Sequence, residues 1–310
     1  MWSNVFFAMK TYAIISVSIC MSLTACTNKD STPKEDVSWK DTLRIKELYQ
    51  FLSQDEIDSI ARLSSGVTRH KGFRAWPQDN DDFRFDTLDN VFWTDIRARN
   101  ADFRGATFRS AECEGSDFSG SDFRVVDIRW TRFDYAVLKN ARFDQAKLFH
   151  VFSEFADYSG SSFKGADMFG MEAPYSKFTG CDFSGALLKD ADLTGSDFTG
   201  SRFIKARLIR TVMNKSVLDS CDFYKADMTG AQFQEASFKG AQLHYANMKG
   251  SHLEGADFSG ADLTGVNFFG ARLEQTNFKD AKNIPRNIRK FIDQNGLATG
   301  ILQEMKENKQ

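Results

Sequence analysis

Apolar and small residues recur every five positions over most of the chain. From Phe103 to Phe278 the central position of this repeat, called i, occurs 36 times and holds Phe 17 times, Leu 10 times, Met 4 times and Ile once. Ala and Ser dominate position i−2, Asp is commonest at i−1, and 17 of the 21 glycines lie at i+2. A period of five fits neither a helix nor a flat strand. The pattern therefore predicts a short extended side followed by a corner, where glycine tolerates a positive φ.

The central residues also follow a second period of 20. Sorted by this period, they form two columns rich in Phe, which start at Phe103 and Phe118, and two mostly aliphatic columns, which start at Phe108 and Cys113. Four columns predict a coil with four sides of five residues each. Such coils would stack at about 4.8 Å, like neighbouring strands, and stacked aromatic rings would add packing energy to burial.

Units such as Ala256–Gly260 (ADFSG) and Ser116–Gly120 (SDFSG) carry the complete motif. They resemble the pentapeptide-repeat family, and the resemblance covers about 60% of the chain. The fold that this resemblance implies is an all-β solenoid, the right-handed quadrilateral β-helix, with four repeats in each coil. We assign this fold to residues 83–282.

Residues 1–25 have the pattern of a signal peptide. An uncharged, mostly apolar run from Thr11 to Ala25 is too short for a membrane span of about 20 residues. The run ends in Leu-Thr-Ala-Cys, in which Cys26 resembles the lipidated cysteine of a bacterial lipobox; an ordinary secretory signal with an incidental cysteine is the alternative. Residues 26–36 are polar and predict a flexible tether. Thr27, where Asp would signal inner-membrane retention, resembles the sorting signal for the outer membrane.

The segment 37–82 precedes the repeats and carries a helical pattern. Apolar spacing predicts two short amphipathic helices at 39–51 and 54–64. A capping box, Ser53 followed by Glu56, supports the start of the second helix.

The segment 283–310 follows the repeats and is predicted to close the end of the β-helix. Terminal coils of a solenoid expose backbone groups and core, so a cap is expected. Pro285 suits the first turn of a helix and Gly296 suits a stop, which predicts a capping helix at 285–294.

Charge and composition exclude several classes of function. The 40 basic and 42 acidic residues leave a net charge of −2, so the chain lacks the basic excess that nucleic-acid binding requires. No nucleophile-and-base pair, phosphate loop or metal-ligand cluster recurs, which predicts a protein that is not an enzyme and has no cofactor and no metal. The four histidines fall on different predicted faces or far apart along the coils: His70, His150, His244 and His252.

The cysteines of the repeats do not form a disulfide pattern. Cys181 and Cys221 share one column but lie two coils apart, beyond the reach of a disulfide. Together with Cys113 they are predicted to be small buried residues.

Large aromatic residues gather at outward positions between residues 130 and 175. On the 20-residue map they fall on two adjacent sides of successive coils, where the central residues Ser153 and Ala173 are unusually small. An exposed aromatic patch of this kind usually marks a contact. The candidate partner-binding residues are Trp130, Tyr135, Phe149, His150, Phe152, Phe155, Phe169 and Tyr175.

The sequence leaves several interpretations of this patch open. An external partner could bind there, or the predicted N-terminal helices could cover it. Phe152 or Met171 could instead turn inward through a bulge and fill the core beside Ser153. A chance grouping is the fourth interpretation.

The chain is therefore predicted to be a non-enzymatic interaction or scaffold module of the bacterial cell envelope. A lipid anchor, in the outer membrane, would hold a rigid β-helical rod that presents a flat face to a protein or a glycan. A purely architectural envelope lipoprotein without a discrete ligand is the alternative. No nucleic-acid partner is expected, and the oligomeric state stays open.

Overall fold

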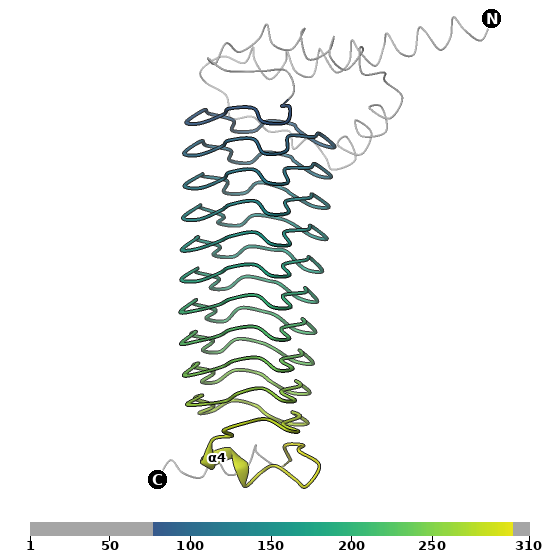
Figure 1. Cartoon of the computed structure of the whole chain (residues 1–310), viewed down its shortest axis with the longest axis vertical. Coiled ribbons are helices and arrows are strands. Elements are labelled where there is room, and N and C mark those ends of the chain that lie inside the picture. Colours follow the sequence, from purple (N-terminus) through teal and green to yellow (C-terminus); the bar gives the residue numbers. More distant parts are fainter. Residues whose placement is uncertain (1–76, 300–310) are drawn as a thin grey trace, which may run out of the picture. The chain divides into compact units, whose positions relative to one another are not determined.

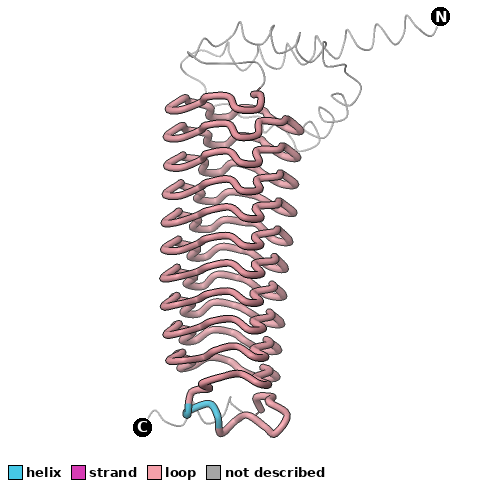
Figure 2. The backbone as a smooth tube through the Cα atoms, in the orientation of Figure 1, coloured by secondary structure: helices cyan, strands magenta, loops and turns pink. Residues whose placement is uncertain are grey.

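The computed structural model describes residues 77–299, which wind into a stack of closely similar coils (Figure 1). Parallel bridges join each residue at i−1 to the residue 20 positions later, from Asp82 paired with Asp102 to Asp262 paired with Lys282. Each of these contacts is a single bridge, so the described coils contain no longer strand (Figure 2). The predicted quadrilateral β-helix, with four sides of five residues in each coil, is confirmed.

The four sides are numbered here from one reference coil. The first side is centred on Phe103, the second on Phe108, the third on Cys113 and the fourth on Phe118. A residue 20 positions away in sequence lies on the same side of the neighbouring coil.

Backbone hydrogen bonds explain why the unit has five residues. The N–H groups of i−1, i and i+2 bond to neighbouring coils, as Phe103 N does to Asp122 O at 2.8 Å. The N–H of i−2 bonds across the corner to the preceding central carbonyl, as Ala106 N does to Phe103 O at 3.0 Å. The remaining N–H group, that of i+1, donates a hydrogen bond to the Asp side chain at i−1. Ser119 N, for example, donates to Asp117 Oδ1 at 3.0 Å. The preference for Asp at i−1 therefore follows from backbone hydrogen bonding.

The central residues fill the interior as continuous columns. On the first side, Phe183 stacks on Phe163 and Phe203 with ring centroids 4.9 and 4.8 Å apart. Phe183 also meets Phe178 of the fourth side edge to face, at 5.7 Å and 62°. Phe133, a central residue of the third side, is likewise fully buried. Each ring thus has parallel neighbours in the coils before and after it, and a tilted neighbour on the adjacent side, both favourable geometries.

The corners lie at position i+2. Every such position from Asn80 to Asp280 has a φ between 49° and 75°, the left-handed region. Seventeen of these corners hold the glycine that the sequence predicted there. The others hold residues with a side chain, for which this conformation costs roughly 1–2 kcal/mol.

The C-terminal helix is shorter than predicted. Helix α4 spans only Arg286–Arg289, so the prediction of a helix over 285–294 is wrong in extent. The Asp293 carboxylate accepts hydrogen bonds from Asn295 N and Leu297 N at 2.8 and 2.9 Å, which holds the chain in a turn instead of a further helical turn.

After this turn the chain pairs with the last coil. Leu297 forms an antiparallel bridge with Asn277, and Phe278 N donates to Gly296 O at 2.7 Å. Ile288 of α4 and Ala298 are fully buried against the core. Backbone pairing supplies acceptors for N–H groups of the last coil, and this pairing takes the place of the second half of the predicted helix.

The remaining predictions about the flanks fall outside the described residues. They concern the signal peptide, the lipidated Cys26, the tether at 26–36 and the two helices at 39–51 and 54–64. Among residues 77–299, no helix has the length and apolar character that crossing a membrane requires.

Replacing Phe183 with Ala should lower the free energy of unfolding by about 3–5 kcal/mol, because it leaves a cavity within the aromatic column. The side chain is fully buried. Phe269→Ala is the matched control, since Phe269 is 63% exposed, and should change the stability by less than about 0.5 kcal/mol. Urea unfolding followed by circular dichroism measures both. A loss below about 1 kcal/mol for Phe183→Ala would mean that the column is not the structural core.

Candidate interaction surface

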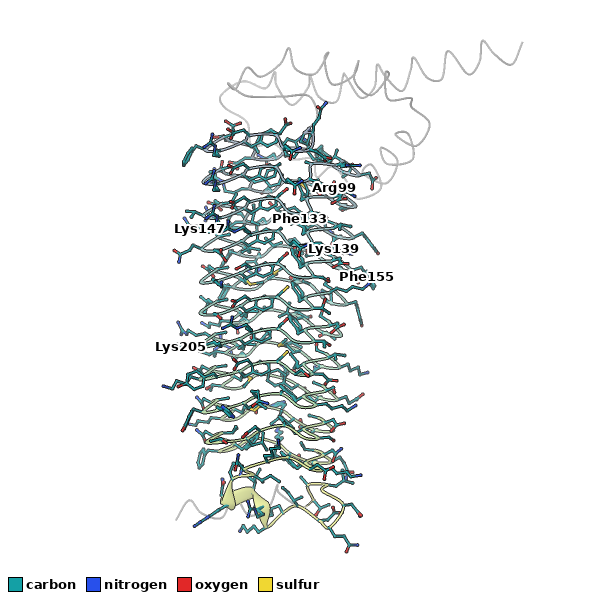
Figure 3. All side chains as sticks on the ribbon, in the orientation of Figure 1. Arg99, Phe133, Lys139, Lys147, Phe155 and Lys205 are labelled. Atoms are coloured by element: carbon teal, nitrogen blue, oxygen red, sulfur yellow. The ribbon has the colours of Figure 1, made fainter. Side chains whose placement is uncertain are left out.

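Three aromatic rings stack along the corner that ends the third side. The ring centroids of Tyr135 and Phe155 lie 5.4 Å apart, and those of Phe155 and Tyr175 lie 5.5 Å apart, with interplanar angles of 18° and 17°. The three side chains are 60%, 48% and 54% exposed. Phe155 points outward in Figure 3. These three residues belong to the candidate set that the sequence indicated and are named here the aromatic ladder.

Four more rings gather at the opposite edge of the third side, where the second side ends. Stacking and edge-to-face contacts join them at centroid distances between 4.3 and 6.0 Å. Arg129 and Lys189 place their cationic groups 5.3 and 5.5 Å from two of the ring centroids. The cluster, named here the tryptophan cluster, consists of Trp130, Phe149, His150 and Phe169.

Five of these seven rings belong to corner residues, and those corners are strained. From Val125 to Phe155 seven successive corners lack glycine, although each has a positive φ. Bulky side chains adopt this region rarely. Glycine occupies the equivalent corners in other coils, for example Gly195 three coils after Tyr135. The coil itself therefore does not require aromatic residues here.

Beneath the surface, neighbouring side chains compensate for the small central residues. Met171, at position i−2 of the third side, is fully buried. Tyr158, a central residue of the fourth side, is also fully buried, and its hydroxyl oxygen lies 2.6 Å from Ser153 Oγ. Burial raises the pKa of Tyr158, so its hydroxyl stays protonated and can donate. The core under the patch is therefore filled, and its buried hydroxyls are paired.

The interpretation that required a bulge is wrong. Position i−2 faces inward in the regular coil, so Met171 reaches the core without a change of register, and Glu172 N keeps its bond to Val151 O at 2.9 Å. Phe152 stays on the outside, half-buried, with the Arg132 guanidinium 5.2 Å from its ring centroid. The interpretation in which the N-terminal helices cover the patch concerns residues outside the described range.

The third side is acidic where the aromatic residues flank it. Between residues 101 and 200 its outward positions hold six carboxylates and one guanidinium. Over the same coils the first side holds four acidic and four basic residues, the second side three acidic and four basic, and the fourth side three acidic and two basic. The six carboxylates belong to Glu112, Glu114, Asp134, Glu154, Glu172 and Asp192. The near-neutral total charge of the chain hides this difference between the sides. Sorting the charged residues by the 20-residue period would have revealed it from the sequence.

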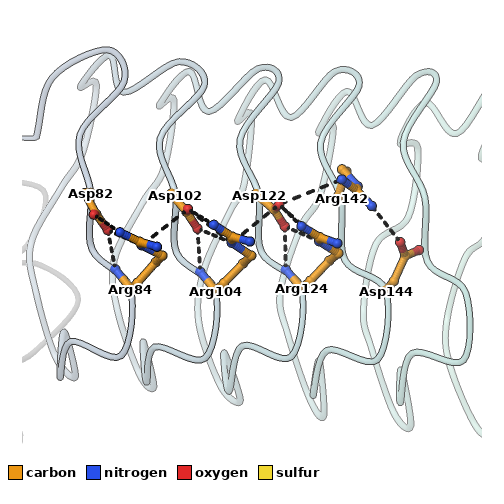
Figure 4. Close-up of polar contacts among 8 residues, drawn as sticks. All are labelled: Asp82, Arg84, Asp102, Arg104, Asp122, Arg124, Arg142 and Asp144. Atoms are coloured by element: carbon orange, nitrogen blue, oxygen red, sulfur yellow. Dashed lines mark hydrogen bonds and ion pairs between the residues drawn. The ribbon is translucent and has the colours of Figure 1, made fainter.

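The first side shows the opposite arrangement, in which charges are paired along the stack (Figure 4). Arg104 Nη2 lies 2.5 Å from Asp102 Oδ2, and Arg104 Nε lies 3.8 Å from Asp122 Oδ2 in the next coil. The hydrogen bonds from Arg104 hold the pKa of Asp102 below its usual value. A side whose charges neutralise each other in this way offers little net attraction to a charged partner.

The other candidate groups lie apart from one another. Residues 77–299 contain no group of three His, Cys, Asp or Glu side chains that could hold a metal ion. Cys113, Cys181 and Cys221 are free and buried, as predicted. Burial raises the pKa of the Cys181 and Cys221 thiols to about 12, so both are inert thiols at neutral pH. His150 belongs to the tryptophan cluster, whereas His244 lies on the first side, 3.2 Å from Asp262.

Comparison with known proteins identifies the repeats. The family model described as pentapeptide repeats matches in 8 copies, over residues 94–124, 176–214, 201–240, 216–255 and 241–280. The coil is therefore the right-handed quadrilateral β-helix of pentapeptide repeats. No curated protein sequence matches the chain.

Two solved structures illustrate the similarity. HetL, a pentapeptide repeat protein involved in heterocyst differentiation regulation from the cyanobacterium Nostoc sp. strain PCC 7120, is 21% identical over 74% of this chain and 98% of its own, with a TM-score of 0.38. Full-length QnrB1, a plasmid-mediated fluoroquinolone resistance protein, is 19% identical over 62% of this chain and 92% of its own, with a TM-score of 0.34. At these values neither structure says what this chain binds.

Tyr158→Phe and Ser153→Ala should each lower the free energy of unfolding by about 1–3 kcal/mol, because each leaves one buried hydroxyl without its partner. The double variant should lose less than the sum of the two, with a coupling energy of roughly 1 kcal/mol. Chemical unfolding of the four proteins gives this cycle. Tyr245→Phe, at a 58% exposed ring, is the control and should have no effect. Strictly additive losses would show that the buried pair does not form.

Proposed function

Since this chain is a pentapeptide-repeat protein, we propose that it is a non-enzymatic interaction module tethered to the bacterial cell envelope. In this proposal Cys26 carries the lipid anchor in the outer membrane, and residues 26–36 connect it to the folded part. The β-helix then presents its third side to a protein or glycan partner.

The observation that supports this proposal is the aromatic ladder. Tyr135, Phe155 and Tyr175 expose large apolar surface on corners where glycine would be less strained. They add nothing to the core, which Met171 and Tyr158 already fill. Exposed aromatic groups that the fold does not need are typical of binding surfaces, in which Tyr and Trp supply much of the affinity.

A purely architectural envelope protein is the second candidate function. The paired charges of the first side favour it, because they stabilise successive coils without offering a surface to a partner. This role gives no reason for the aromatic ladder, so we rank it below the interaction module.

A partner of the third side should be lost when the ladder is removed. Photo-cross-linking in intact envelopes would compare the wild type with Tyr135→Ala/Tyr175→Ala. The matched control, Tyr224→Ala/Tyr245→Ala, removes two tyrosines from the first side and should keep every cross-link. Stability should change by less than about 1 kcal/mol in both, since the ladder is outside the core. A ladder variant that keeps all cross-links would favour the architectural role.

Cys26 is expected to be the lipidated N-terminus of the mature protein. Radiolabelled palmitate should be incorporated into the wild type, whereas Cys26→Ser should take up none. Lipidation joins the anchor to the cysteine sulfur through a thioether, which a serine hydroxyl cannot form. Cys113→Ser is the control and should label like the wild type. Equal labelling of Cys26→Ser and the wild type would contradict the lipid anchor while leaving the interaction surface to be judged by cross-linking.

A further inference from the structure

At one end of the third side, acidic groups lack an ion-pair partner in the described chain. They can therefore attract a partner of opposite charge. Near the N-terminal end Arg132 lies 2.8 Å from Asp134, 3.3 Å from Glu114 and 3.7 Å from Glu112, so one guanidinium serves three carboxylates. In the next two coils Glu154 and Glu172 are exposed and form no ion pair within the described part of the chain. The uncompensated charge therefore lies in the coils that carry the ladder.

The aromatic groups frame these carboxylates on both edges. In the unit 151–155, Phe152 and Glu154 point outward, His150 forms the corner before them and Phe155 the corner after them. A Lys or Arg side chain matches this order of chemistry, because its methylene stem packs on apolar surface while its charged end reaches a carboxylate. Exposed acidic residues between apolar edges therefore complement a basic polypeptide in both charge and hydrophobic contact.

The ring geometry is less suited to a sugar. A pyranose binds an aromatic residue by stacking on an open ring face. The faces within the ladder cover one another at 5.4 and 5.5 Å, so Phe155 has neither face open. The far face of Tyr175 lies over Gly195, where an added Cβ would meet its Cδ1 at 2.7 Å. The ladder thus presents mainly ring edges and hydroxyl groups to the outside.

From these observations we propose that the third side, between the tryptophan cluster and the aromatic ladder, is the docking face for a polypeptide segment rich in Lys and Arg. This inference rests on the proposed function and names its partner class. The stems of the basic side chains lie against the exposed rings, and their charged groups pair with Glu154 and Glu172. The first side, with its charges already paired (Figure 4), does not compete for this partner.

The test measures fluorescence anisotropy of a labelled synthetic peptide that alternates Lys and Val, added to the full lipidated chain in nonionic micelles. The wild type should bind this peptide, and more weakly as salt is raised. Glu154→Gln/Glu172→Gln should raise the Kd about tenfold. The control Glu235→Gln/Asp280→Asn removes the same charge at least three coils away from Tyr175 and should leave the Kd unchanged. Tyr135→Ala/Tyr175→Ala should also raise the Kd about tenfold, whereas Tyr224→Ala/Tyr245→Ala should not.

Three results would overturn the inference. The first is an equal loss of binding in the control charge variant, which would mean that the peptide senses only net charge. The second is equal binding of a peptide with Glu in place of Lys. The third is binding of a neutral chitin oligosaccharide that depends on Tyr135 and Tyr175, with no binding of the Lys peptide. In the third case the proposed interaction module stands with a glycan as its partner, so the two proposals fail separately.

Discussion

The register of backbone hydrogen bonds between coils is the constraint on which the rest of this structure depends. Because each residue at i−1 pairs with the residue 20 positions later, every position keeps its direction from one coil to the next. A shift of one residue would turn the central Phe side chains toward water. The central residues therefore face inward in every coil, and each ring is placed by its neighbours, as Phe183 is between Phe163 and Phe203.

This constraint explains which parts of the structure the sequence could predict. The repeat is local, so the inward residues, the corners and the four sides are visible in the pattern itself. The C-terminal segment is different, because its conformation depends on a distant coil. Apolar spacing alone predicted a helix over 285–294, but pairing of Leu297 with Asn277 favours a turn after α4. Likewise, the small Ser153 is explained only when Tyr158 reaches it across the corner.

The register does not fix which side chains occupy the outward positions. These positions can therefore vary between coils and carry residues that serve binding. The sequence pattern places large aromatic residues at outward positions, where rings stand out among polar residues, and Tyr135, Phe155 and Tyr175 are exposed. It did not show the acidic character of the third side. Basic residues elsewhere in the chain balance those carboxylates in the total, and only the arrangement in space shows that Glu154 and Glu172 form no ion pair in the described coils.

The energetics of the ladder decide between a role in folding and a role in binding. Each aromatic corner costs roughly 1–2 kcal/mol of backbone strain, part of which the lower chain entropy of a non-glycine residue offsets. Two ring stacks return about 0.5–1.5 kcal/mol each. Three such corners cost about 3–6 kcal/mol and two stacks return about 1–3 kcal/mol, so the ladder adds no net stability to the coil. Its ring edges, however, remain in water at 60%, 48% and 54% exposure. The favourable free energy still available to Tyr135, Phe155 and Tyr175 lies in removing those edges from water, and only a contact from outside the coil does this.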